Sequence, residues 1–148
     1  MMVGATIIDI GTRKALEANG ASIASGALAQ ANDASYDIVS DGGGCTDAKF
    51  IISGTFTTAP TENTTLAVYA QPLDIDGTND ADAPETTRPT VFVGTVQVNN
   101  VTSTQYFELL AENVPWKANY YLHNNGTGQT LSAGWKMDVI PYTSSPSA

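Results

Sequence analysis

The stretch "KFIISGTF" (residues 49–56) decides the fold class of this chain. Its large apolar side chains recur at alternate positions, at Phe50, Ile52 and then Phe56, and polar residues such as Lys49 fall between them. Successive side chains of a β-strand point to opposite faces, so this spacing places the apolar residues on one face. The stretch therefore predicts a strand that is half-buried against a core.

Similar alternation continues toward the C-terminus in five further runs. They are "TTLAVYAQPL" (64–73), "TVFVGTVQV" (90–98), "TQYFELLA" (104–111), "KANYYLHN" (117–124) and "WKMDVIPY" (135–142). The sets expected to share a face are Leu66 with Val68; Phe92 with Val96 and Val98; Phe107 with Leu109; Tyr120 with Leu122; and Trp135 with Met137 and Val139. Runs rich in Thr, Val, Tyr and Phe at this period, separated by polar turns, predict an antiparallel all-β sandwich or barrel.

The first forty residues differ in composition, being rich in Ala, Ser, Gly and Asn. "TRKALEA" (12–18) predicts one or two helical turns with Thr12 as the N-cap, ending at Asn19-Gly20. Two interpretations of this region stay open: weak strands that complete the sandwich, or an extended arm that orders against a partner. We expect an N-terminal arm over residues 1–40, a sandwich domain over 41–143 and a loose tail over 144–148.

Composition and charge narrow the class of protein. The chain has 148 residues, 42% of them hydrophobic and only 14% charged, as expected for one globular domain. No apolar run approaches the ~20 residues that span a bilayer. Six basic residues are scattered among fifteen acidic ones, giving a formal net charge of −9. Phosphate backbones and anionic membranes bind clustered cations, so we expect neither nucleic-acid nor membrane binding.

The N-terminal residues and the single cysteine indicate the compartment. The apolar run "VGATIIDIG" (3–11) is followed, not preceded, by Arg13 and Lys14, which is the wrong order for a secretory signal. Cys45 is the one cysteine, so no internal disulfide forms. We expect synthesis in a cytoplasm.

The acidic stretch "LDIDGTNDADAPE" (73–85) imitates a calcium loop. The first, third, fifth, seventh, ninth and twelfth places are held by Asp74, Asp76, Thr78, Asp80, Asp82 and Glu85. Three details oppose a metal site: the glycine, Gly77, precedes the sixth place, Pro84 stiffens the chain before Glu85, and both flanks are strand-like where a helix is required. We interpret the stretch as a polar excursion between two strands.

The sequence shows no set of residues in a pattern typical of a catalytic site. The one histidine, His123, is expected at the surface or rim of the sandwich, without a nucleophile to activate. Cys45 lies near Asp41 and Asp47, which disfavour a thiolate. "NNGTGQT" (124–130) lacks the lysine of a phosphate loop and is interpreted as a hairpin turn. The chain is thus expected not to be an enzyme, with no catalytic, cofactor-binding or metal-binding residue and no cofactor.

Aromatic residues gather in the last third of the chain. Tyr120 and Trp135 fall in register with core residues, whereas Trp116 and Tyr121 are candidates for an exposed platform. Such a platform is typical of carbohydrate-binding modules and equally of protein interfaces.

Two long stretches resemble small structural proteins of tailed bacteriophages. They are "YAQPLDIDGTNDADAPETTRPTVFVGTVQV" (69–98) and "YYLHNNGTGQTLSAGWKMDVIPYT" (120–143). The resemblance implies a sandwich of jelly-roll type with an N-terminal arm. It also implies a virion protein: a capsid decoration or cement protein, that is, a minor capsid protein on the capsid exterior. Such a protein is assembled in the host cytoplasm, binds the major capsid protein and forms homo-oligomers, either dimers or trimers. The alternative is a carbohydrate-binding or adhesin-like appendage module of the virion.

Overall fold

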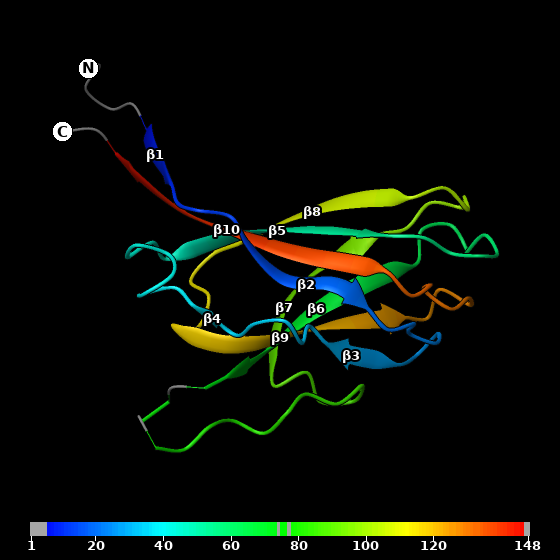
Figure 1. Cartoon of the computed structure of the whole chain (residues 1–148), viewed down its shortest axis with the longest axis horizontal. Helices are drawn as coiled ribbons and strands as arrows, with labels where there is room; N and C mark the ends of the chain where they lie inside the picture. The colour runs from blue at the N-terminus through cyan, green and yellow to red at the C-terminus, as the bar shows by residue number, and fades with distance from the viewer. Residues whose placement is uncertain (1–5, 74, 77, 147–148) are drawn as a thin grey trace.

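The chain folds into two antiparallel β-sheets packed face to face (Figure 1). The computed structural model describes residues 6–73, 75–76 and 78–146, and its regular elements over these ranges are ten strands. None of these residues forms a helix that is long and apolar enough to cross a membrane. The predicted all-β antiparallel sandwich is confirmed.

Each sheet contains five strands. The sheet named here the β5 sheet runs in the order β1-β10-β5-β8, with β2 also on β10. Its strands are β1 (Thr6–Ile10), β2 (Lys14–Gly20), β5 (Asp47–Gly54), β8 (Gln105–Ala111) and β10 (Trp135–Pro146). The β6 sheet runs in the order β3-β9-β6-β7, with β4 also on β9. Its strands are β3 (Leu28–Gln30), β4 (Tyr36–Asp37), β6 (Thr65–Pro72), β7 (Val91–Gln97) and β9 (Lys117–Asn125).

Strand pairing is nested from the ends of the chain inward. β2 pairs with β10, β3 with β9, β5 with β8, and β6 with β7. The members of these four pairs alternate between the two sheets, so the chain is a long hairpin rolled up on itself. This is the connectivity of a jelly roll, the type of sandwich that the phage resemblance implies.

The core lies between the sheets and follows the predicted alternation. In β5, Phe50 and Ile52 are fully buried and alternate with half-buried residues. The same-face sets of β8, β9 and β10 are confirmed, with Trp135 and Tyr120 buried in the core.

β7 departs from its predicted pattern at a bulge. Val68 of β6 lies opposite Gly94, but the next residue, Tyr69, lies opposite Phe92, so Val93 is an extra residue. The bulge reverses the side-chain direction, and Phe92 is 56% exposed on the outer face instead of joining Val96 at the core. Placing Phe92 and Val96 on one face was therefore wrong.

The N-terminal third completes the sandwich with weak strands. The predicted helix at 12–18 is wrong, because these residues form β2, with Glu17 opposite Met137 of β10. Leu16 is fully buried between the sheets, and this burial overrides the high helix propensity of Ala, Leu and Lys. Ile23 and Tyr36 are buried as well. Residues 14–38 thus belong to the sandwich and not to an arm.

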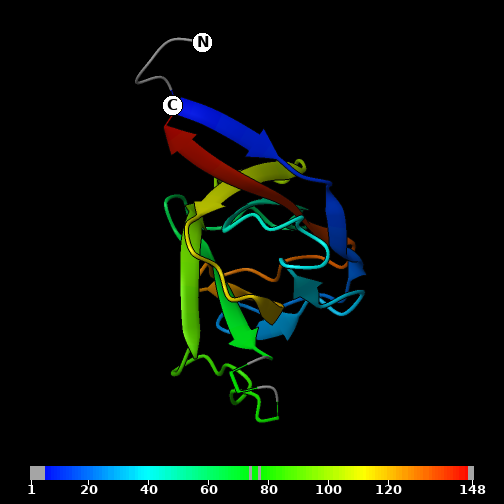
Figure 2. The same ribbon diagram turned by 90° about the vertical axis from the view of Figure 1, so that its left-hand side faces the viewer.

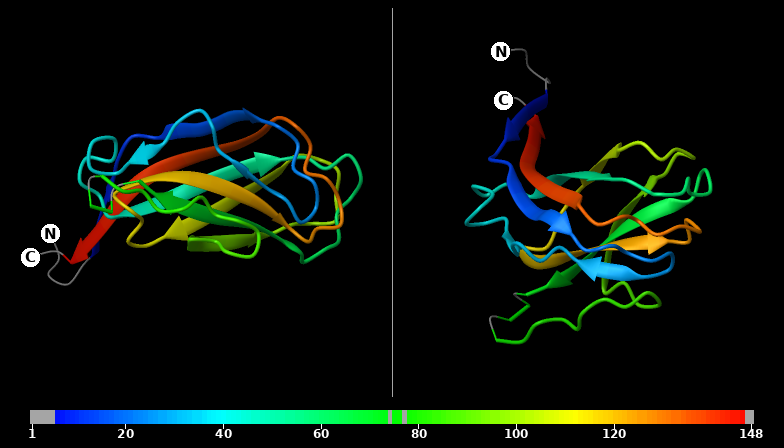
Figure 3. Two further views of the ribbon diagram at one scale, coloured as in Figure 1. Left: turned by 90° about the horizontal axis from the view of Figure 1, so that it is seen from below. Right: turned by 45° about the vertical axis from the view of Figure 1, so that its right-hand side comes forward.

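One two-stranded element does project from the sandwich. β10 has its last β5 partner at Tyr142, and in the described part of the chain residues 143–146 pair with β1 alone. We call residues 6–10 and 142–146 the terminal ribbon. It leaves the sandwich at one end and contains the first and last described residues of the chain (Figures 2 and 3). Residues 144–146, expected to be a loose tail, therefore form strand, and residues 147–148 lie outside the described ranges.

Candidate interaction surfaces

The outer face of the β5 sheet carries a continuous apolar surface at the base of the terminal ribbon. Large apolar residues meet there because Ile10 lies opposite Tyr142 and Ile140 lies near Leu110, across Lys49. We define the apolar face as Ile8, Ile10, Leu110, Ile140 and Tyr142. Ile8, Ile10 and Leu110 are 62%, 72% and 59% exposed.

The apolar face is hollowed into a groove. The groove has a volume of about 250 Å³ and is lined by the five residues of the apolar face and by Lys49. Lys49 places its ammonium group 3.0 Å from Glu108 on the neighbouring strand, so its charge is partly compensated. Farther along the same strand, Tyr106 is 77% exposed. Exposed apolar side chains gathered in this way make the apolar face a candidate interaction surface.

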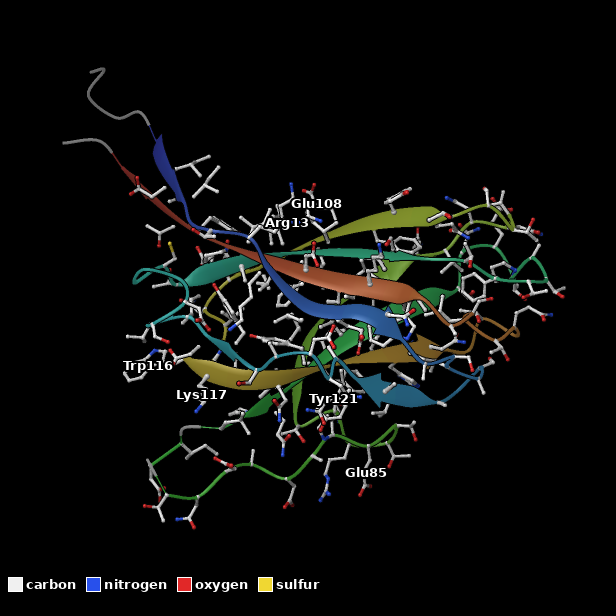
Figure 4. The ribbon with its side chains drawn as sticks, in the orientation of Figure 1. Arg13, Glu85, Glu108, Trp116, Lys117 and Tyr121 are labelled. Atoms are coloured by element: carbon white, nitrogen blue, oxygen red, sulfur yellow. The ribbon has the colours of Figure 1, made fainter. Side chains whose placement is uncertain are left out.

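The balance of charge differs between the two sides of the molecule, although the strands of the β5 sheet also carry acidic residues: Asp9, Glu17, Asp47, Glu108 and Asp138. Of the six basic residues, four lie on or next to strands of the β5 sheet: Arg13, Lys14, Lys49 and Lys136. By contrast, residues 73–90, which we call the acidic excursion, hold five of the fifteen acidic residues and one basic residue. Figure 4 shows Glu85 of the excursion on the side of the molecule opposite Arg13 and Glu108.

Three carboxylates of the acidic excursion, those of Asp76, Asp82 and Glu85, have partners within it. Asp76 accepts hydrogen bonds from the backbone N–H groups of Asn79 and Thr78, at 2.7 and 2.8 Å. These bonds, with another from the Asn79 side chain, hold the pKa of Asp76 below its usual value. The guanidinium group of Arg88 lies 3.4 Å from the carboxylate of Glu85 and 3.8 Å from the carboxylate of Asp82.

Calcium binding by the acidic excursion would require several carboxylates that converge on one point. Among the described residues, no group of three or more His, Cys, Asp or Glu side chains is placed to hold a metal ion. Asp74 and Gly77, which belong to the imitation calcium loop, lie outside the described ranges. The flanking segments are the strands β6 and β7, as the sequence predicts.

Tyr121 is not an exposed platform. It is 8% exposed, and its hydroxyl lies 3.3 and 3.2 Å from the side-chain oxygens of Gln30 and Gln71, which share its one proton as acceptors. Gln71 in turn donates to the backbone carbonyl of Ala81 in the excursion. The excursion is thereby fixed to the outer face of the β6 sheet, and Figure 4 shows Tyr121 on that side, facing the excursion. The prediction failed because the sequence does not show which face a long loop covers.

His123 is also buried, contrary to its predicted place at the surface. It is 5% exposed, and its Nδ1 lies 2.8 Å from the hydroxyl of Tyr69. Leu28 of β3 packs beside it against Tyr69 and Tyr121, and this small outer cluster removes the ring from water. Burial lowers the pKa of His123 below its ordinary value.

We expect the buried imidazole to make stability depend on pH. Below the ordinary histidine pKa of about 6.5, the unfolded chain takes up a proton that the folded protein resists, so stability falls as the pH is lowered through this window. The free energy of unfolding, measured by urea titration, should therefore be lower at pH 5.5 than at pH 7.5. In His123→Asn this decrease should be smaller. An equal decrease in the variant would contradict the assignment.

Trp116 is the exposed aromatic residue of the predicted pair. Its side chain is 70% exposed beside a hollow lined by Ile38, Val39, Cys45 and Val114, among others. Figure 4 places Trp116 at one end of the molecule, next to Lys117. Cys45 is half-buried there, whereas His123 lies toward the other end of β9. The structure therefore does not bring the thiol and the imidazole together.

The apolar face had only a partial signal in the sequence. "TIIDI" (6–10) alternates at period two, which indicates a strand. Nothing in that alternation shows whether the apolar side meets the core or water. That distinction depends on β10 running beyond β5, which is a property of the whole sheet.

No protein-family model matches the chain, and no curated protein matches its sequence. Among solved structures, one chain comes from Bacillus endospore appendages, described as a novel family of disulfide-linked pili. It is 13% identical, with a TM-score of 0.33, over 97% of this chain and 94% of that chain. A chain of turnip yellow mosaic virus is 16% identical, with a TM-score of 0.37, over 99% of this chain and 83% of that chain. At these low scores the similarity carries no argument about function.

Proposed function

We propose that this chain is a structural protein of a tailed-bacteriophage particle, a capsid decoration or cement protein that binds the major capsid protein. The observation that carries the proposal is the apolar face, where Ile8, Ile10 and Leu110 are each more than half exposed. Aliphatic side chains gathered in this way gain free energy when a partner covers them, at about 25 cal/mol per Å² of apolar area.

The distribution of charge supports one orientation on the particle. The acidic excursion lies on the opposite side from the apolar face. If the apolar face docks on the lattice, the excursion points to solvent, where its carboxylates stay hydrated and like-charged neighbours stay apart. The partner surface that fits is apolar, with a carboxylate placed to reach Lys49 in the groove.

The rest of the molecule agrees with a structural role on the capsid exterior. The sandwich has a well-filled core, with fully buried side chains such as Trp135, Phe50 and Leu122. The single Cys45 leaves the fold independent of disulfide formation, which suits assembly in a host cytoplasm. Binding would hold adjacent capsid subunits together and so stabilise the head.

Cosedimentation with purified capsids tests this proposal. We expect the wild-type protein to sediment with capsids in fixed stoichiometry, and Leu110→Asp to bind at least tenfold more weakly. The reason is that the substitution puts a carboxylate into the groove, and this charge must lose its hydration when the apolar face docks. Phe92→Asp is the matched control: Phe92 is 56% exposed but lies on the outer face of the β6 sheet, so binding should be unchanged.

Thermal melting of both variants establishes that they are folded. Capsids that never bind the wild-type protein, or that bind Leu110→Asp as tightly as wild type, would overturn the proposal.

A second candidate function rests on Trp116. Its 70% exposed ring stands beside a hollow, as in a carbohydrate-binding or adhesin-like appendage module where a sugar stacks on an aromatic face. A glycan-array signal that disappears in Trp116→Ala but persists in Leu110→Asp would favour this candidate.

A further inference from the structure

The outer edge of β1 is a strand edge with free hydrogen-bonding groups. β1 pairs with β10 on one side, and the described residues provide no strand on its other side. Natural edge strands are often protected by charged side chains, by proline or by a bulge. β1 (Thr6–Ile10) contains no proline and no lysine, its register with β10 is continuous, and Asp9 is its one charged residue.

One hydrogen bond fixes which backbone groups point to this edge. The N–H of Gly11 donates to the carbonyl of Pro141 at 2.8 Å, so residues 11 and 141 form a hydrogen-bonded pair. Such pairs alternate with non-bonded pairs along an antiparallel ladder. Ile10 opposite Tyr142 and Ile8 opposite Ser144 are therefore non-bonded pairs. The N–H and C=O groups of Ile8 and Ile10 point away from β10, to the free edge.

We propose that two copies of this chain pair through β1, antiparallel, about a two-fold axis at Ile8. An antiparallel strand pair of identical segments is related by a two-fold axis, so the same edge serves both copies. In this register Ile8 pairs with Ile8 of the second copy, and Ile10 pairs with residue 6. The three pairs form about six hydrogen bonds and join the two terminal ribbons into one four-stranded sheet.

The edge itself favours a second copy as the occupant, because it is complementary to its own antiparallel copy, and the charges of β1 do not oppose this pairing. Asp9 is the one charged residue of β1, and the register places it opposite residue 7 of the second copy, so the two Asp9 side chains are not directly opposed. The acidic excursions of the two copies lie on the sides away from the β5 sheets, where mutual repulsion is weak.

Pairing of the ribbons also changes the apolar face. Ile8 and Ile10 line the groove with their side chains while their backbone groups face the edge. The two grooves of a dimer are therefore continuous across the axis, because neighbouring strands of a sheet present alternate residues to the same face. The inference does not depend on the capsid proposal.

Site-directed cross-linking tests the register. In a Cys45→Ser background, Ile8→Cys should give a disulfide-linked dimer on mild oxidation with copper phenanthroline. In the proposed register the Cα atoms of residue 8 in the two copies are about 5.5 Å apart, within the range that a disulfide bridges. Ile10→Cys is the matched control: the two residues 10 are four positions apart along the strands, about 14 Å, and should not cross-link. Equal cross-linking of both variants, or none in Ile8→Cys, would overturn the register.

Sedimentation equilibrium provides an independent measurement. The wild-type protein and Ile8→Val should be dimers, whereas Ile8→Pro should be a monomer with an unchanged circular dichroism spectrum. Proline at this position removes an N–H that points to the free edge and leaves the β1–β10 bonds in place. A monomeric wild type, or a dimeric Ile8→Pro, would refute the pairing. If the wild-type protein does not bind capsids, the cross-linking and sedimentation results are still expected. The capsid proposal and the β1 pairing proposal can therefore fail separately.

Discussion

Replacing Trp135 by alanine is expected to lower the free energy of unfolding by about 3–5 kcal/mol, the usual loss for a large buried aromatic residue. The indole is 1% exposed at the start of β10, and its Nε1 donates to the backbone carbonyl of Ala21 at 2.8 Å. The ring also lies against Gly20, where an added Cβ would overlap its Cε2 atom. Removing the ring leaves a cavity and an unpaired carbonyl together.

Urea denaturation followed by circular dichroism measures this loss. Trp135→Phe is the matched control: it keeps an aromatic ring and loses the hydrogen bond to Ala21, so it should cost about half as much. Gly20→Ala should also destabilise the protein, because its methyl group would occupy the position of the indole. A loss below about 1 kcal/mol in Trp135→Ala would show that the packing described for β2 and β10 is wrong.

The second large effect is expected at Asn124, near the end of β9. Its side chain donates to the carbonyls of Ile23 and Gln129, at 2.9 and 2.8 Å, and accepts from the hydroxyl of Thr127 at 2.6 Å. The residue is fully buried, so Asn124→Ala removes these bonds where water cannot replace them. We expect a loss of about 2–4 kcal/mol in the free energy of unfolding.

The neighbouring residue is the control for this prediction. Asn125 donates to Thr65 at 3.0 Å on an exposed surface, so Asn125→Ala should change stability by less than about 0.5 kcal/mol. Equal effects of the two substitutions in urea titrations would contradict the anchoring role of Asn124.

The sequence predicted the strands whose apolar residues are large and regularly spaced. β5 and β10 are examples, because Phe50, Ile52, Met137 and Val139 alternate without interruption and all are buried. Their burial outweighs the local preferences of the single residues, so in β5 and β10 the period-two pattern predicts the strand and its buried face.

β2 shows why the N-terminal third was harder to predict. "KALEANG" (14–20) combines good helix formers with one large apolar residue, Leu16, and its strand conformation depends on pairing with β10, more than a hundred residues away. Glu17 is buried as well, and its carboxylate accepts hydrogen bonds from the N–H groups of Asn19 and Asn32. No local pattern contains that information.

The candidate surfaces were predictable to different degrees. Trp116 was placed correctly, because it stands outside the alternation of its neighbours. His123 and Tyr121 alternate as surface residues of β9, but β3 and the acidic excursion cover their face. The apolar face depends on the unequal lengths of β5 and β10, which alternation does not report.

The nested pairing of strands has a consequence for how the protein is made. β10 is an inner strand of its sheet, bonded to β1, β2 and β5, yet it comes last in the described chain. Contacts between segments so distant in sequence give a high contact order, which slows folding because long loops must close first. While the ribosome is still adding β10, β2 and β5 have unpaired edges, and nascent chains are exposed to mispairing with one another. The sandwich can close only after β10 has left the ribosomal tunnel.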